Sequence, residues 1–214
     1  MKYRPPTILF LLTFVASISG IALAEPSTAS PIPNEADILE ELNAARTNPK
    51  AYARHLEDMR KYFDGSKYRR PGETTLVTKE GVSAVDEAIA FLRSVSPVKP
   101  LSLSRGMSKA AADHAKDQSR SGKTGHDGRE GSQPWDRVNR YGTWSGKIGE
   151  NVGYGGDRTA RESVISLIVD DGVASRGHRT NIFNLDYHVV GIACGTHPKW
   201  RTVCVSDFAQ TYQE

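Results

Sequence analysis

The chain has 214 residues, a formal net charge of +3 at neutral pH and two cysteines. This length is enough to bury one substantial core without a metal or further disulfides, and the nearly balanced charge gives no electrostatic case for binding nucleic acid or an anionic membrane. We therefore expect a single small globular domain with no nucleic-acid partner.

The first 24 residues have the features of a cleavable signal peptide. Lys2 and Arg4 give a basic start, residues 8–15 are almost wholly apolar, and Ala22-Leu23-Ala24 matches a cleavage site. The apolar stretch is short for a membrane span, and no other segment approaches the roughly 20 apolar residues that a span requires. Without Lys2 and Arg4, 26 basic side chains face 25 acidic ones, a net charge of +1. The sequence thus predicts a secreted or periplasmic protein without a transmembrane segment.

The remainder divides into an arm and one domain. Residues 25–36 are rich in proline, serine and threonine, which predicts a flexible arm, and we expect residues 37–214 to form a single domain. Apolar residues recur at helical spacing from Ile38 to Leu56, with a restart at Pro49 in the first turn of the second piece.

Two further helices are predicted between residues 82 and 118. Residues 62–75 contain turn dipeptides and predict a loop, whereas residues 82–92 carry the spacing of an amphipathic helix. Residues 107–118 form an alanine-rich helix that can pack closely against a sheet. His114 lies in the middle of this helix, and we interpret it as a hydrogen-bonded packing residue rather than a ligand.

A capped helix is predicted in the second half. Thr159 and Glu162 match a capping box, in which the two side chains satisfy the first free amides of a helix. The helix continues through Ile168 with an almost wholly apolar surface, typical of burial between other elements. Residues 170–172 then end it before the loop that carries His178. Glu162 is therefore predicted to cap its own helix and not to reach a site.

The two cysteines lie in two β-rich segments. Cys194 ends residues 188–194 and Cys204 lies within residues 202–208, and a hairpin would place them opposite each other. In an exported protein this favours a disulfide with Cα atoms about 4.4–6.8 Å apart. The alternative, a catalytic cysteine paired with histidine, is less favoured because thiols rarely stay free in an oxidising compartment.

The candidate chemistry lies in three glycine-flanked segments: Gly125-His126-Asp127-Gly128, Gly149-Glu150-Asn151 and Gly177-His178-Arg179. Imidazoles and a carboxylate that converge can bind a divalent metal or transfer protons. Their wide spacing differs from that of a histidine pair on one helix, so spacing alone gives little metal specificity. By themselves, His126 also fits an exposed turn and Glu150 fits a hydrogen-bond clamp at a strand end.

The sequence around these residues resembles the CAP superfamily, which comprises cysteine-rich secretory proteins, antigen 5 and pathogenesis-related 1 proteins and is also called the SCP domain. The resemblance covers roughly residues 38–212. The segments that carry it are Gly149-Glu150-Asn151-Val152, Gly177-His178-Arg179-Thr180-Asn181-Ile182-Phe183, the helix at residues 110–118 and Asp207-Phe208-Ala209-Gln210. The segment that follows His178 resembles the bacterial branch. The resemblance implies an α+β fold, a three-layer α/β/α sandwich with a central antiparallel sheet and a cleft at one end.

The resemblance also implies a tetrad of two histidines and two acids. His126, Glu150 and His178 match three of its positions. Animal members supply the fourth acid three residues after a tryptophan, and the comparable helix here offers Ile168 and then Asp171, beside Asp170. We take Asp171 as the fourth candidate, with a solvated loop residue as the alternative.

Membership of such a family does not select a reaction. Our leading interpretation is a binding module whose cleft takes a small ligand, which includes a lipid, or a divalent cation such as Zn²⁺, and a protein partner is also compatible. The alternative is a metal-assisted hydrolase or peptidase in which His126 and His178 hold Zn²⁺ and Glu150 is the general base. A catalytic zinc usually has three protein ligands, which counts against this alternative.

Overall fold

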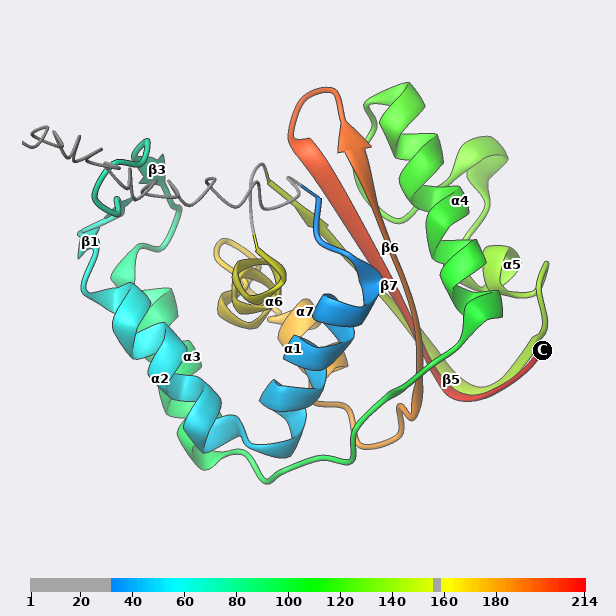
Figure 1. The fold of residues 1–214 in the computed structure, drawn as a ribbon, viewed down its shortest axis with the longest axis horizontal. Coiled ribbons are helices and arrows are strands. Elements are labelled where there is room, and N and C mark those ends of the chain that lie inside the picture. Colours follow the sequence, from blue (N-terminus) through cyan, green and yellow to red (C-terminus); the bar gives the residue numbers. More distant parts are fainter. Residues whose placement is uncertain (1–31, 156–158) are drawn as a thin grey trace, which may run out of the picture.

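The computed structural model describes residues 32–155 and 159–214, and it shows helices on both faces of a four-stranded sheet (Figure 1). This three-layer arrangement is the α/β/α sandwich that the sequence predicts. The predicted signal peptide, residues 1–24, and most of the predicted arm lie outside the described residues. Within those two ranges, no helix combines the length and the apolar character needed to cross a bilayer.

The first helical pair begins two residues before the predicted domain boundary. Helix α1 spans Glu35–Thr47 and α2 spans Pro49–Arg60, with Asn48 between them. The Asn48 side chain accepts a hydrogen bond from the backbone N–H of Ala51 and so caps α2. Pro49 suits the first helical position because its missing N–H would have no partner there. The predicted restart is confirmed.

The sheet has the strand order β4-β6-β7-β5. Its three long strands, β5 (Thr143–Tyr154), β6 (Val189–His197) and β7 (Arg201–Gln213), pair antiparallel as predicted. The two-residue strand β4 (Ser102–Leu103) pairs parallel with β6 and makes the sheet mixed. Strand β5 forms the other edge of this sheet.

One face of the sheet is covered by α4 (Arg105–Ser121) and the short helix α5 (Pro134–Val138) (Figure 1). Helix α4 lies so close to β6 that a Cβ at Gly191 would be 2.1 Å from the carbonyl carbon of Met107. Only glycine fits at that contact. Helix α5 was not predicted, because five residues are too few to show a helical period.

The other face carries α6 (Ala160–Val169) and α7 (Gly177–Ile182), with α1 beside them and the pair of α2 and α3 (Val82–Ser94) further out (Figure 1). The predicted capping box is confirmed: the Glu162 carboxylate accepts from the Thr159 N–H at 2.9 Å, and the Thr159 hydroxyl accepts from the Glu162 N–H at 3.2 Å. The other Glu162 oxygen pairs with Arg70.

The main core lies between the sheet and these helices, and it includes the fully buried side chains of Leu42, Leu56, Leu92, Ile168 and Phe208. A buried arginine crosses it. Arg46 of α1 donates to the carbonyl oxygens of Ile182 and Tyr187, at 2.5 and 2.9 Å. Burial lowers the pKa of Arg46 to about 10, so it stays charged at neutral pH. This clamp fixes the chain just after α7.

The predicted loop at residues 62–75 instead contains part of a small antiparallel sheet. Strands β1 (Phe63–Asp64), β2 (Lys67–Tyr68) and β3 (Leu76–Val77) have two residues each and pair in that order. Gly65 adopts a φ of 57° in the turn between β1 and β2, which is why a turn signal stood out in the sequence.

The predicted disulfide is confirmed, since Cys194 and Cys204 face each other on β6 and β7 and are bonded. Their Cα atoms are 4.1 Å apart, slightly closer than the expected range. Facing residues of antiparallel strands can already approach to about 4.5 Å, so the sheet brings the two cysteines close before the bond is made.

We expect replacement of both cysteines by alanine to lower the free energy of unfolding by roughly 3 kcal/mol, because the cross-link restricts the unfolded chain across a sequence separation of 10 residues. Denaturant unfolding with and without a reductant measures the loss. The free energy of unfolding of the reduced wild type should fall to that of the variant, and the reductant should not change the free energy of unfolding of the variant. A wild type whose stability does not respond to reduction would contradict this.

Candidate functional site

Glu150 forms the centre of the candidate site. It lies on the edge strand β5, and its side chain is only 1% exposed. One carboxylate oxygen accepts from Nδ1 of His126 at 2.8 Å, and the other accepts from Nη2 of Arg137 at 2.6 Å. Burial favours the neutral acid, but these hydrogen bonds and the Arg137 charge outweigh it and hold the pKa of Glu150 below its ordinary value.

Arg137 is a site residue that sequence reasoning missed. It is buried on α5, and its second guanidinium nitrogen donates to the Ser132 carbonyl at 2.6 Å. A Cβ at Gly128 would lie 2.9 Å from this guanidinium, so glycine lets the loop close over it. The 3-10 turn Arg129–Gly131 leads the chain from this loop towards α5. Only the fold brings Arg137 to Glu150.

His126 presents its ring to solvent with one nitrogen held. Its side chain is 51% exposed. Because the partner of Nδ1 is a carboxylate, Nδ1 carries a proton and Nε2 of the neutral ring keeps a lone pair. The hydrogen bond to Glu150 raises the pKa of His126 above its usual value, and burial opposes this in part.

His178 lies on α7 and is held in the same way by a different acid. Its Nδ1 is 2.6 Å from Oδ1 of Asp170, and its backbone N–H donates to Oδ2 of the same carboxylate at 2.9 Å. Asp170 ends α6 in the left-handed conformation, with a φ of 57°. The segment carrying His178, expected as a loop, is thus a short helix whose first turn binds a buried carboxylate.

Asp171, the candidate for the fourth acid, makes its contacts away from both histidines. Its carboxylate accepts from the backbone N–H groups of Lys79 and Glu80, both at 2.7 Å, and so anchors the segment before α3. The chain turns left-handed at Asp170, and the acid that contacts His178 is Asp170. One sequence feature could have pointed to Asp170: it lies at the predicted helix end, shortly before Gly172, and aspartate tolerates the left-handed backbone that often ends a helix.

Two asparagines join the halves of the site. Asn151 donates to the backbone carbonyl of His178 at 3.0 Å, and Asn181 donates to the Asn151 side chain at 2.9 Å. Consecutive residues of β5 therefore hold the two histidine segments. Side chains alternate along a strand, so Glu150 engages the α4 face of the sheet and Asn151 the α7 face. The histidines approach the edge strand from opposite sides.

His114 has the packing role that the sequence indicates. Its ring is fully buried, and Nε2 lies 2.9 Å from the Gly125 carbonyl oxygen and 4.0 Å from the nearer Glu150 oxygen. Burial lowers the pKa of His114. A neutral imidazole at this position packs against the loop that precedes His126 and contacts it at the Gly125 carbonyl.

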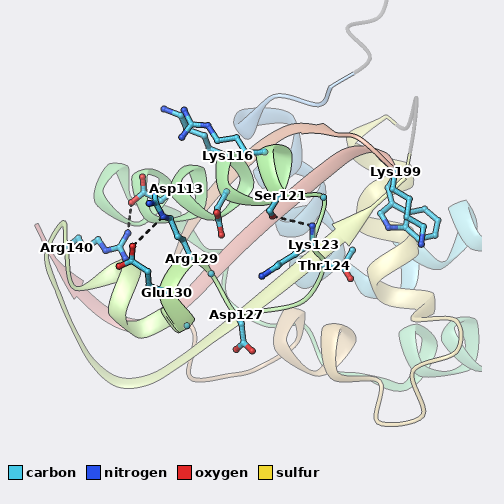
Figure 2. A pocket seen from close by; sticks show the side chains of 16 residues that line it. Asp113, Lys116, Ser121, Lys123, Thr124, Asp127, Arg129, Glu130, Arg140 and Lys199 are labelled. Atoms are coloured by element: carbon cyan, nitrogen blue, oxygen red, sulfur yellow. Dashed lines mark hydrogen bonds and ion pairs between the residues drawn. The ribbon is translucent and has the colours of Figure 1, made fainter.

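A cavity of about 1170 Å³ lies beside this site and does not include it. It is bounded by α4, by the 122–131 loop and by Lys199 and Trp200 at the β6–β7 turn (Figure 2). Asp127 and Gly128, which follow His126, line it, but none of His126, Glu150, Asp170 and His178 does. Its basic side chains are Lys116, Arg120, Lys123, Arg129, Arg140 and Lys199. The charged groove and the histidine site are thus neighbours that share one loop.

A metal ion at this site would have to be held by the two imidazoles. Across the described parts of the chain, no three side chains of histidine, cysteine, aspartate or glutamate are grouped so that they could hold a metal ion together. Glu150 and Asp170 are occupied with the histidine Nδ1 atoms, so they serve as partners of possible ligands and not as ligands themselves.

The family model of the cysteine-rich secretory protein family, CAP, matches residues 39–208. Two solved structures resemble the chain at 17% identity: an outer surface protein from Borrelia burgdorferi, with a TM-score of 0.44 over 52% of this chain and 78% of that one, and an extracellular protein containing a SCP domain from Bacillus anthracis str. Ames, with a TM-score of 0.45 over 61% of this chain. The chain spans 38% of the Bacillus protein. None of the curated proteins compared with it matches.

We expect Arg137→Met to lower the free energy of unfolding by about 3–5 kcal/mol, because it leaves the buried Glu150 charge without its cation. The matched control is Arg140→Met, which breaks an exposed pair with Asp113 at 3.1 Å. That loss should be less than about 1 kcal/mol. Denaturant unfolding compares the two, and equal losses would contradict a central role for the buried pair.

Glu150→Gln should lower the pKa of His126, because the variant keeps the side-chain size but loses the carboxylate that raises this pKa. Protonated His126 adds stability at acidic pH, since its folded-state pKa is the higher one, and that contribution is lost as pH rises through the folded pKa. Titration of the ring protons by NMR gives the value directly. Glu162→Gln, at the far capping box, is the control, and a His126 pKa that is the same in all three proteins would reject the assignment.

Proposed function

Because the chain belongs to the cysteine-rich secretory protein (CAP) family, we propose that it is an exported binding module in which His126 and His178 take a divalent cation, with Zn²⁺ as the best match. The observation that carries this proposal is that each ring is held through Nδ1 by a carboxylate, at 2.8 Å for Glu150 and 2.6 Å for Asp170. Histidines that bind metals almost always donate their other ring N–H in this way.

The donor set fits a weakly held, exchangeable ion. The carboxylates fix the tautomer that leaves Nε2 of each ring with a lone pair, and no group within residues 32–155 or 159–214 is hydrogen-bonded to either Nε2. Two imidazoles are fewer than the protein ligands of a structural zinc, so other coordination positions stay open to water or to a ligand. A bound cation would supply a Lewis acid to which an anionic or carbonyl group can coordinate.

Glu150, the general base of the hydrolase alternative, is not placed to act as a base. Both Glu150 oxygens are engaged, by His126 and by Arg137, and the side chain is almost fully buried. A general base must come within hydrogen-bond reach of the water that it activates. Glu150 holds His126 in place instead, which favours binding over metal-assisted hydrolysis.

The neighbouring groove supports a small polar ligand more than a lipid. Its walls carry Lys116, Arg120, Lys123 and Lys199 together with Asp117 and Asp127. An acyl chain would leave these charged groups without water, at a cost that apolar contacts there could not offset. A ligand with anionic and hydroxyl groups could contact this groove and reach the His126 loop.

The test is a calorimetric titration of the purified protein with Zn²⁺. We expect His126→Ala and His178→Ala each to abolish measurable binding, and Asp170→Asn to weaken it about 10- to 100-fold, as loss of a carboxylate behind a metal-bound histidine does. Affinity should also weaken as pH falls through the histidine range, because only neutral imidazole binds the ion.

His55→Ala is the matched control, because His55 lies on α2 outside the site and should leave the affinity unchanged. Thermal unfolding without metal should show that all four variants stay folded. Zinc affinity that survives in His178→Ala would place the ion elsewhere and overturn the proposed site.

A further inference from the structure

A second acid lies behind Glu150 and has no place in the proposed chemistry. Asp207 of β7 faces Glu150 directly across the β5–β7 pair, so the two side chains point to the same face of the sheet. Asp207 is fully buried, and neither of its carboxyl oxygens receives a hydrogen bond from a donor in the described parts of the chain. A buried carboxylate in that position would be unsatisfied.

The groups around Asp207 explain how a buried carboxyl without hydrogen-bond donors is tolerated. Strand β5 presents Glu150 and α5 presents Arg137, and the facing residue on β6 is Gly191. His114 of α4 lies 4.0 Å from the nearer Glu150 oxygen. The Arg137 charge is already balanced by Glu150, at 2.6 Å. A second ionised acid would therefore leave one uncompensated negative charge in a water-free interior, which is costly enough that the group takes a proton instead.

The proton belongs on Asp207 and not on Glu150. Glu150 accepts hydrogen bonds from His126 and Arg137, both of which favour its ionised form, whereas Asp207 has no such donors. Burial raises the pKa of Asp207 well above its ordinary value, and the nearby Glu150 charge raises it further. Two carboxyl groups can share a hydrogen bond only when one of them is protonated.

We propose that Asp207 is a neutral carboxylic acid that donates its O–H to Glu150 and thereby positions this carboxylate for His126. No hydrogen bond or ion pair joins Asp207 to His126 or His178 among the described residues, so it acts through Glu150 as a positioning residue. Its link to ligand binding rests on the proposed function, but its protonation does not depend on it. Glu150 then accepts from His126, Arg137 and Asp207, which fixes the carboxylate in orientation and charge.

The first test measures proton linkage. Unfolded Asp207 releases its proton near its ordinary pKa, but the folded protein keeps it, so the wild type must lose stability as pH rises above that value. Asp207→Asn carries no such proton. From pH 5 to pH 7, the unfolding constant of the wild type should therefore grow about tenfold per pH unit relative to that of Asp207→Asn. A ratio that does not change with pH would overturn the proposal.

A direct measurement on the unmodified protein makes the test independent of how the variants fold. The side-chain carboxyl carbon of Asp207, assigned by its loss in Asp207→Asn, should resonate at the position of a protonated acid throughout pH 5–7. A resonance at the ionised position would overturn the proposal.

The positioning role is tested by rescue. Asp207→Asn keeps a donor towards Glu150, so the ring-nitrogen resonances of His126 should match those of the wild type, whereas Asp207→Leu should shift them. Ser206→Ala, at the neighbouring residue whose side chain points to the other face, is the control. Unshifted His126 resonances in folded Asp207→Leu would overturn the positioning role. If the wild type binds no Zn²⁺ but shows the proton linkage, the proposed function is rejected and the protonation of Asp207 still holds.

Discussion

The buried ion pair between Arg137 and Glu150 is the interaction on which the site depends. Both side chains are almost fully removed from water, and such a pair is tolerated only when further hydrogen bonds satisfy its remaining groups. Here Ser132 and His126 supply two of them. The pair therefore does more than hold a helix to a strand: the same carboxylate that balances the arginine also fixes the orientation of the histidine ring.

The second histidine is held by backbone geometry. Asp170 accepts the side chain and the backbone N–H of His178, and it can do so because the chain turns left-handed where α6 ends. Arg46 and Asn151 then fix α7 through backbone carbonyls. Loss of one histidine ring should thus leave the fold intact, because the core and these clamps supply the stability and the rings do not.

The sequence could predict those features whose signal is local. The capping box at Thr159 and Glu162, the restart at Pro49 and the facing cysteines each depend on residues close in the chain or on a single hairpin. The acid that contacts His178 could not be identified from the sequence, because one residue of left-handed backbone decides between Asp170 and Asp171. Nothing in the sequence connected Arg137 or Asp207 with Glu150, since that proximity exists only once α5 and β7 are packed against it.

The distribution of charge sets the chemistry available to the two rings. Arg137 balances Glu150, so the His126 half of the site is close to neutral. Arg176 and Arg179 are paired with Glu80 and Glu87, and among the described residues the Asp170 carboxylate pairs only with His178. A negative charge therefore stands directly behind His178. If the proposed cation binds, this charge attracts it to the His178 side of β5, and the exposed His126 ring offers the second ligand. On the proposed function, this division of charge would let a site with two imidazole ligands favour a cation and still release it.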